Sequence, residues 1–432
     1  MTSDIIADRP AAAHRPSASR VIIAASVGNM LEWFDFLIYG YFAATLAKVF
    51  FPVGDSTASL MITFGTFGLS YLVRPLGAIV IGGYTDRHGR RAGLTLSIAL
   101  MMIGTAMMAL TPGYATIGLA APILVMLARL LQGFSVGGEF GSATAFLVEH
   151  SETRKGFYAS WQWASTGVTS LIASGFGVGL TGLLTDDQLL GWGWRIPYLF
   201  GLLLGPVGLY IRNRMAETPE FEAIEPTQTP VRDLLRRHPV AIFLAVGASI
   251  ISNSSFYVIL YIPTYAVKQL GLPASTGFVA TLVGAALLTV VTPFAGHWSD
   301  KIGRPPIMLV MAGLFVLTSY PVFGLMVAYP SLLSAVLAAS WLNLIKAGYS
   351  GVLPSLLAGL FPTETRAIGM SLSYSISLTI FGGFAPLIAT WLIATTGNPL
   401  SPSFYLMFTA LLSMAALIVV QRRGRHPKRE ER

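Results

Sequence analysis

The stretch GGYTDRHGRR at residues 82–91 returns in altered form as GHWSDKIGRP at residues 296–305, 214 positions further along the chain. A second pair of segments, ETRKG at 152–156 and ETRAIG at 364–369, is separated by 212 positions. Two unrelated segments that recur at nearly the same distance indicate an internal repeat. The repeat predicts that the chain folds as two similar halves.

The amino-acid composition predicts an integral membrane protein. Of the 432 residues, 54% are hydrophobic and only 11% are charged, whereas soluble globular chains are about 25% charged. The net charge of +8 does not indicate nucleic-acid binding, because the basic residues gather in short clusters between apolar runs. Cytoplasmic loops of membrane proteins have this pattern. The chain has no cysteine, which excludes disulfides and cysteine metal sites.

Twelve apolar runs are long enough to cross a bilayer as helices, which takes about 20 residues each. They lie at residues 20–45, 57–83, 92–111, 117–147, 156–181, 194–212, 240–267, 275–297, 305–328, 331–360, 366–392 and 402–421. Strong period-two alternation is absent, so helices are expected rather than strands. We predict an all-α integral membrane protein with twelve transmembrane helices, in two six-helix halves related by an axis along the membrane normal.

The basic residues predict the orientation in the membrane. With both termini in the cytoplasm, 22 of the 28 lysines and arginines fall in cytoplasmic segments, as the positive-inside rule requires. We expect a multi-pass protein of the cell inner membrane. Its expected parts are a cytoplasmic tail at 1–19, a helical bundle at 20–212, a cytoplasmic linker at 213–239, a second bundle at 240–421 and a cytoplasmic tail at 422–432.

The pattern G-x-x-x-D-R/K-x-G-R in both copies of the repeated loop resembles the loop signature of the major facilitator superfamily. Glycine at 89 permits a tight turn, and aspartate at 86 can accept hydrogen bonds near a helix end. The resemblance implies a conformational latch on the cytoplasmic side. Its residues are Gly82, Asp86, Arg87, Gly89, Arg90, Asp300 and Arg304. The alternative is a basic loop that only sets topology.

Further stretches give a closer resemblance. LVRPLGA at 72–78, ARLLQGFSVGGEFG at 128–141, GFYASWQ at 156–162 and WGWRIP at 192–197 resemble the metabolite:proton symporter family of that superfamily. The stretches at 255–272 and 371–393 are most similar to its citrate and tricarballylate symporters. The resemblance implies the major facilitator fold and proton-coupled uptake. Lys346 in the tenth apolar run departs from this pattern and leaves the exact substrate open.

Six ionisable residues fall well inside the apolar runs: Glu32, Asp35, Arg74, Arg129, Glu139 and Lys346. A charged side chain at the bilayer centre costs roughly 2.5 to 3.5 kcal/mol, so such residues face a cavity or pair with one another. Arg129 and Lys346 fall near the midplane of equivalent helices, and we expect both to face one central cavity. There they would hold an anion, Arg129 as a two-pronged fork and Lys346 as a point charge. The alternative is structural ion pairs, Arg129 with Glu139 or Arg74 with Asp35.

The buried acids predict a proton pathway. Burial favours the neutral acid and a nearby arginine favours the carboxylate, so a balanced group can load and release a proton. Asp35 is the first candidate for proton carrier, followed by Glu32 and Glu139, with Arg74 as their counter-charge. Glu32 and Asp35 are three residues apart on one helix, so their titrations could be coupled. The alternative is that one of the three acids, Glu139 above all, only neutralises an arginine.

Uncharged polar side chains in the same runs are candidates for ligand hydrogen bonds. They are Trp161, Gln162, Asn253, Tyr257, Tyr261, Asn343 and Tyr374. The alternative for each is a role in helix packing.

Other function classes lack their motifs. The chain has no GxxxxGK(S/T) loop and no catalytic constellation, and its six histidines lie in tails, loops or helix ends. We therefore expect no enzyme, metal site or cofactor, and no nucleic-acid partner. We predict a monomeric, proton-coupled symporter that imports a di- or tricarboxylate through the lipid bilayer by alternating access. The alternatives are transport or exchange of another organic anion, such as an aromatic acid or sulfonate, and a non-transporting receptor.

Overall fold

The computed structural model describes residues 18–88, 90–136, 139–149, 151, 153–214 and 230–425. In the N-terminal half, residues 18–214, the helices are α1 (Ala18–Tyr41), α2 (Ala43–Phe50), α3 (Ser56–Leu72), α4 (Arg74–His88), α5 (Arg90–Leu110), α6 (Tyr114–Ile117), α7 (Ala120–Ser135), α8 (Glu139–Glu149), α9 (Lys155–Leu183), α10 (Asp186–Gln188), η1 (Leu189–Gly193) and α11 (Arg195–Arg214).

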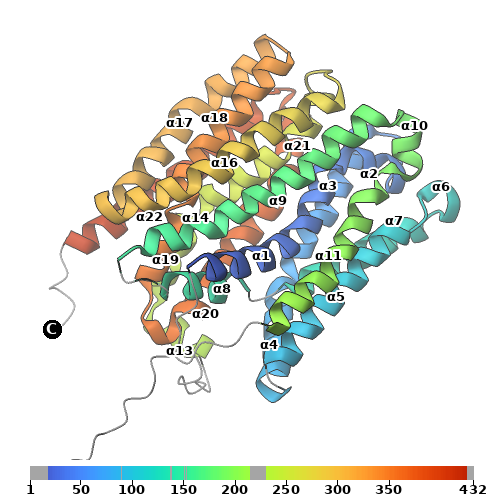
Figure 1. Ribbon diagram of the computed structural model, residues 1–432. Coiled ribbons are helices and arrows are strands. Elements are labelled where there is room, and N and C mark those ends of the chain that lie inside the picture. The colour runs from blue at the N-terminus through green and yellow to red at the C-terminus, as the bar shows by residue number, and fades with distance from the viewer. Residues whose placement is uncertain are drawn as a thin grey trace, which may run out of the picture.

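In the C-terminal half, residues 230–425, the helices are α13 (Pro230–Arg237), α14 (Pro239–Leu260), α15 (Ile262–Lys268), α16 (Ala274–Ile302), α17 (Arg304–Ala328), α18 (Leu332–Ser350), α19 (Leu353–Leu360), η2 (Thr363–Thr365), α20 (Arg366–Ser377), η3 (Leu378–Gly383), α21 (Ala385–Thr396) and α22 (Ser401–Arg425). Figure 1 shows the blue-to-green helices of the N-terminal half beside the yellow-to-red helices of the C-terminal half.

The predicted all-α architecture is confirmed for the described part of the chain, which contains helices and no strand. Each of the twelve predicted spans coincides with one helix or with consecutive helices. Eight helical segments among the described residues are long and apolar enough to cross a membrane, and Thr95–Leu110 and Ala120–Ser135 are shorter apolar helices. Buried apolar side chains of both halves form one core.

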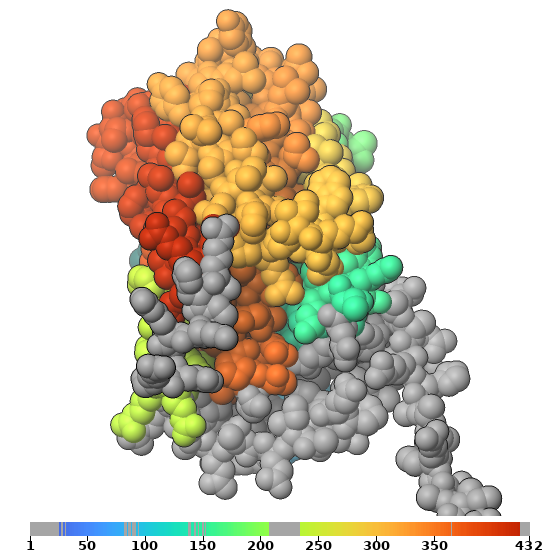
Figure 2. Space-filling model, turned by 90° about the vertical axis from the view of Figure 1, so that its left-hand side faces the viewer, coloured from blue at the N-terminus to red at the C-terminus, as the bar shows by residue number. Residues whose placement is uncertain are grey.

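The outer surface of the C-terminal half is apolar. Figure 2 shows the face formed by the gold and orange helices of that half and by α22 in red. Leu317 of α17 is 73% exposed, and Phe404 and Phe408 of α22 are 48% and 55% exposed. Large exposed apolar side chains in such number match the acyl chains of a bilayer rather than water.

Helices α9 and α16 form the seam between the two halves, where they lie side by side (Figure 1). Glycine allows the close approach, since a Cβ added at Gly156 would overlap the carbonyl oxygen of Gly296. Nearer the other end of the seam, a Cβ at Gly177 would overlap the ring of Phe278. The halves therefore touch near both ends of these helices.

A proline break in the second predicted span creates a second link between the halves. Helix α3 ends at Leu72 and α4 begins at Arg74, just before Pro75. Proline has no N–H for the carbonyl four residues earlier, that of Tyr71. The hydroxyl of Thr379 in η3 donates to this carbonyl at 3.2 Å. The break thus gives the C-terminal half a backbone acceptor in the N-terminal half.

Candidate functional site

A small polar cavity, with space for about one water molecule, lies between the two halves. Its lining from the N-terminal half is Asn29, Glu32, Trp33, Arg74, Val136, Phe140 and Gln162. Its lining from the C-terminal half is Ser371, Tyr374 and Ser375 of α20. A ligand in this cavity would contact both halves at once.

The charged groups of this cavity are Glu32 and Arg74, both buried. Arg74 Nη2 lies 3.9 Å from Glu32 Oε1. The guanidinium carbon lies 4.7 Å from the ring centre of Tyr71 and 4.9 Å from that of Phe36. Arg74 Nε and Nη2 have no hydrogen-bond acceptor among the described residues. Aromatic faces therefore surround Arg74, and its donors are incompletely used.

An amide pair at one wall ties α1 to α9. Gln162 Nε2 donates to Asn29 Oδ1 at 2.8 Å, and Asn29 Nδ2 donates to the Gln162 carbonyl oxygen at 3.0 Å. Asn29 Nδ2 also reaches the hydroxyls of Ser165 and Thr166, at 2.8 and 3.0 Å. The other side-chain acceptor, Gln162 Oε1, has no donor within the described ranges. This wall therefore retains one acceptor for a ligand hydroxyl or a protonated acid.

A second polar cluster lies inside the N-terminal half. Arg129 Nη1 donates to Gln132 Oε1 at 2.8 Å, and Gln132 Nε2 donates to Asp35 Oδ2 at 3.3 Å. Thr105 donates to the same carboxylate oxygen, and Arg129 Nη2 lies 3.4 Å from Ser70 Oγ. Asp35 and Arg129 are thus joined through an amide rather than by direct ion pairing.

Rings enclose Arg129, which is fully buried. Its guanidinium carbon lies 4.6 Å from the ring centres of Phe36 and Tyr39 and 5.3 Å from that of Phe67. Asp35 Oδ1, in the same cluster, has no hydrogen-bond donor in the part of the chain that the structure describes.

Lys346 of α18 is fully buried at the boundary between the halves. Its ammonium donates to the Ser252 carbonyl at 2.9 Å and to Ser350 Oγ at 3.1 Å. It lies 3.8 Å from the ring centre of Trp163, which belongs to α9, and 5.1 Å from that of Phe256. Among the described residues Lys346 has no carboxylate partner.

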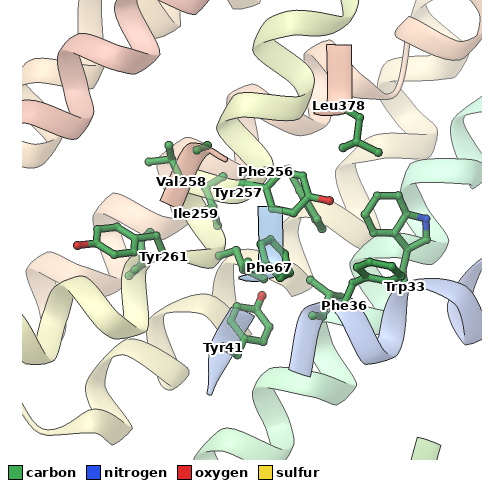
Figure 3. Close-up of a cluster of buried hydrophobic side chains, with 14 of the residues drawn as sticks. Trp33, Phe36, Tyr41, Phe67, Phe256, Tyr257, Val258, Ile259, Tyr261 and Leu378 are labelled. Carbon is green, nitrogen blue, oxygen red and sulfur yellow. The ribbon is translucent and has the colours of Figure 1, made fainter. Parts of the chain in front are cut away.

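Figure 3 shows a cluster of buried side chains from both halves, among them Trp33 and Phe36 of α1 and Phe256 of α14. The ring centres of Trp33 and Phe256 are 5.6 Å apart, and those of Phe256 and Trp163 are 5.7 Å apart. The Arg129 guanidinium contacts the ring of Phe36, whereas the Lys346 ammonium contacts the rings of Trp163 and Phe256. Neither Arg129 nor Lys346 lines the polar cavity. The structure thus does not bring these two residues together there, and their roles in binding stay predictions.

The other predicted ligand-binding side chains divide into two sets. Gln162 and Tyr374 line the cavity, where the Tyr374 ring stacks on Phe140 with a centroid distance of 3.7 Å. Those outside its lining are Trp161, Asn253, Tyr257, Tyr261 and Asn343.

Hydrogen bonds place most of the second set. Tyr257 donates to the Tyr71 hydroxyl at 2.6 Å, across the halves. Asn253 donates to Ser377 at 3.2 Å, and Asn343 donates to the Ala339 carbonyl at 2.9 Å. The indole nitrogen of Trp161 and the hydroxyl of Tyr261 are buried without a partner in the described ranges.

One copy of the repeated loop lies at the seam between α9 and α16. Asp300, near the end of α16, accepts the backbone N–H groups of Gly156 and Phe157 at 2.7 and 3.1 Å. These N–H groups belong to the first turn of α9, where the helix dipole favours a carboxylate. Asp300 and Arg304 also line a surface pocket together with Thr153 and Lys155.

Several predicted residues fall outside the described part. Gly89 lies outside the described residues, as do the side chains of Asp86, Arg87, Arg90 and Glu139, and Gly82 is described only as part of the α4 backbone. The latch role of both loops and the proton role of Glu139 stay predictions.

Sequence reasoning missed several residues that surround the site. They are Asn29, Trp33, Tyr71, Trp163, Phe256, Ser371 and Ser375. Asn29 and Trp33 lie within one helical turn of Glu32, and Ser371 and Ser375 flank Tyr374 on α20. Spacing of three or four residues from a predicted residue would have found Asn29 and Ser371. No local signal identifies Trp163 as the neighbour of Lys346.

Comparisons with known proteins agree with this architecture. A family model described as Major Facilitator Superfamily matches residues 25–340. The chain is 38% identical to a citrate-proton symporter of Klebsiella pneumoniae over 413 residues, covering 93% of this chain and 92% of that one. It is 36% identical to a putative proline/betaine transporter of Staphylococcus aureus (strain MSSA476), covering 93% and 87% of the two chains.

A solved structure shares the fold. The xylose transporter XylE from E. coli, in a partially occluded inward-open conformation, has a TM-score of 0.73 to this chain. The two are 15% identical, and the match covers 94% of this chain and 97% of that one. The predicted twelve-helix fold class is confirmed by these comparisons.

Proposed function

The chain belongs to the major facilitator superfamily, and from that premise we propose that it is a proton-coupled symporter that imports a small organic anion, a di- or tricarboxylate similar to citrate. Its relatives are transporters and not enzymes, and the chain is a membrane-spanning transporter of the same kind. The anion, protons and the surrounding lipid are its proposed partners, and we propose that it acts as a monomer.

The buried cation Lys346 is the observation that carries the proposal. An ammonium group enclosed in protein is unfavourable unless an opposite charge accompanies it. Its described neighbours are a carbonyl, a hydroxyl and two rings. A carboxylate of the substrate would supply the missing charge. Arg129, held by an amide and a hydroxyl, is a second candidate for an anion contact.

The ring faces argue against a betaine-like substrate for this chain. Quaternary ammonium groups are recognised by aromatic faces. Here Arg74, Arg129 and Lys346 already lie against the central rings. A ligand cation would meet like charge there, whereas an anion would not.

Asp35 is the proposed proton carrier. Thr105 and Gln132 hold one of its oxygens, and the other has no donor within the described residues. A protonated Asp35 is neutral in this buried cluster, and a deprotonated one is stabilised by nearby Arg129. Glu32, Glu139 and Arg74 are proposed to complete the proton pathway.

Alternating access is proposed to arise from rocking of bundles 20–212 and 240–421 about the cavity, joined by the linker 213–239. The loops with Asp86 and Asp300 would latch the cytoplasmic side. The orientation that follows from the basic loops places both tails, 1–19 and 422–432, in the cytoplasm, with the protein in the inner membrane.

A competition experiment in proteoliposomes tests the substrate class. Exchange of labelled citrate is measured against unlabelled tricarballylate, a dicarboxylate, an aromatic acid, a sulfonate, proline and glycine betaine. We expect competition by tricarballylate and the dicarboxylate and none by proline or betaine. Labelled betaine that exchanges while citrate does not would reject the proposal. Exchange without any response to proton gradients would make the protein an exchanger.

A further inference from the structure

Arg74 has more hydrogen-bonding capacity than its surroundings use. Arginine and carboxylate usually form two parallel hydrogen bonds of about 2.7 to 2.9 Å. In this protein Arg74 Nη2 lies 3.9 Å from Glu32 Oε1, which is longer than such a hydrogen bond. Arg74 Nε and Nη2 are buried without an acceptor in the described ranges, and the residue lines the cavity. The guanidinium group of Arg74 therefore brings to the cavity hydrogen-bond donors that have no acceptor among the described residues.

We propose that this cavity is a carboxylate-binding subsite in which one carboxylate of the substrate replaces Glu32 at Arg74, and that Glu32 takes up a proton as it is displaced. This inference rests on the proposed function, because it takes the substrate to be a carboxylate. It assigns Glu32 a role in coupling that is separate from that of Asp35.

The charge balance favours exchange over simple addition. Before binding, Arg74 and Glu32 cancel each other's charge. A second carboxylate beside them would leave one buried negative charge without a partner, which is costly. If Glu32 binds a proton, the substrate carboxylate and Arg74 again form a neutral pair.

The surroundings of Glu32 support proton uptake. The titratable or charged side chains that face it are Arg74 from α4, Tyr71 from α3 and Tyr374 from α20, within the described residues. Asn29 and Gln162 from α1 and α9 are neutral. Arg74 is a cation close to Glu32, and once the substrate occupies Arg74 a proton on Glu32 supplies the positive charge that balances it. The side chain of Glu139, at the start of α8, lies outside the described part.

The cavity also offers a chemical partner for the displaced acid. A protonated carboxyl group donates one hydrogen bond, and Gln162 Oε1 is a buried acceptor without a donor among the described residues. The hydroxyls of Ser371, Tyr374 and Ser375 come from the other half. They can bind the remaining oxygens of a substrate whose first carboxylate is held by Arg74, which would join the halves through the ligand.

Calorimetry on the purified full-length protein in lipid nanodiscs tests the inference. Binding of citrate and of tricarballylate is measured at pH 6 and pH 8, each in two buffers of different ionisation enthalpy, so that proton uptake is obtained directly. The variants are Glu32→Gln, which mimics the protonated acid, and Glu32→Asp, which keeps a titratable group. Asp187→Asn removes an exposed carboxylate elsewhere and serves as the control.

At pH 8 the wild type should take up about one more proton per bound citrate than Glu32→Gln, since binding and proton uptake are reciprocally linked. In the pH range in which Glu32 is ionised, the citrate dissociation constant of the wild type should rise about tenfold per pH unit relative to that of Glu32→Gln. The reason is that the wild type binds one proton for each citrate. Glu32→Gln should therefore bind more tightly than the wild type at pH 8. Glu32→Asp and Asp187→Asn should keep the wild-type proton uptake. Because the proteins are compared with the same ligand, protons that the ligand itself binds or releases cancel in the difference between them.

Equal proton uptake by the wild type and Glu32→Gln would overturn the exchange, while citrate transport by both would leave the proposed function intact. Weaker binding by Glu32→Gln at both pH values would also overturn it, since Glu32 would then only support the site. A wild type that binds neither citrate nor tricarballylate would overturn the inference and the proposed substrate class together. Should Glu32→Gln fail to fold, Glu32→Asp decides: loss of proton uptake in a folded Glu32→Asp protein contradicts the exchange.

Discussion

The ammonium group of Lys346 lies 3.8 Å from the centre of the Trp163 ring, although the two residues belong to different halves of the chain. The lysine is in α18 and the tryptophan in α9. A buried cation at the boundary between the two halves is in a position where a bound anion would lie close to both. The lysine also carries an energetic cost in the empty transporter.

Replacement of Lys346 by methionine should separate binding from stability. We expect citrate affinity to fall about 10- to 100-fold, the loss of a hydrogen bond to a charged group worth about 1.5 to 3 kcal/mol. The ligand-free variant should melt at the same or a higher temperature, because an unpaired buried charge is removed. Binding is measured by calorimetry and melting by intrinsic fluorescence. The exposed Lys48→Met is the control. Unchanged affinity would remove Lys346 from the binding site.

Replacement of Asp35 by asparagine should uncouple transport from protons. The amide keeps the size of the side chain but cannot release a proton, so uphill accumulation of citrate should be lost. Exchange of internal for external citrate should persist, because it needs no net proton movement. Both activities are measured in the same proteoliposomes, with Asp187→Asn as control. Uphill accumulation by Asp35→Asn would assign the proton to another group.

The hydroxyls of Tyr71 and Tyr257 form one hydrogen bond of 2.6 Å across the halves. Each single change to phenylalanine leaves the other buried hydroxyl without this partner, which costs about 1 to 3 kcal/mol. The double variant should therefore melt at a temperature no lower than either single variant. Melting points of the four proteins give the coupling. Additive losses would mean that the two hydroxyls do not stabilise the protein as a pair.

The seam between α9 and α16 requires glycine at position 156. A Cβ there would overlap the carbonyl oxygen of Gly296, so Gly156→Ala must separate the helices. Overpacking costs about 1 to 3 kcal/mol, and we expect citrate uptake to fall about tenfold or more through loss of the closed seam. Gly179→Ala on the same helix meets open space and should retain uptake. Equal uptake by both variants would show that closure of this seam is not needed for transport.

The fold followed from the sequence because its signals are local. Apolar runs of membrane length, a repeated loop and basic clusters each indicate helices or topology without knowledge of packing. The rotation of each helix about its own axis, by contrast, depends on packing against other helices and has no local sequence signal. Depth alone placed Arg129 and Lys346 near one level, but the partners of Arg129 turn it into its own half: Gln132, Ser70 and the rings of Phe36 and Tyr39.

Glu32 and Asp35 illustrate the same limit. Their spacing of three residues leaves about 60° between them on a helix of 3.6 residues per turn. That angle is enough to give them different neighbours. Glu32 faces Arg74 in the cavity, while Asp35 faces Thr105 and Gln132 in the N-terminal half. The sequence identified both acids, and only the packing of α4, α5 and α7 around α1 separates their surroundings.

Proton-driven accumulation of citrate tests most directly whether this protein is a proton-coupled symporter of a citrate-like anion. Wild-type protein is reconstituted into liposomes with an inward proton gradient, and labelled citrate is followed over time beside protein-free liposomes. We expect citrate to accumulate above the external concentration, and this accumulation should collapse when a protonophore is added. Citrate uptake that proceeds equally without a proton gradient, and never exceeds the external concentration, would contradict it.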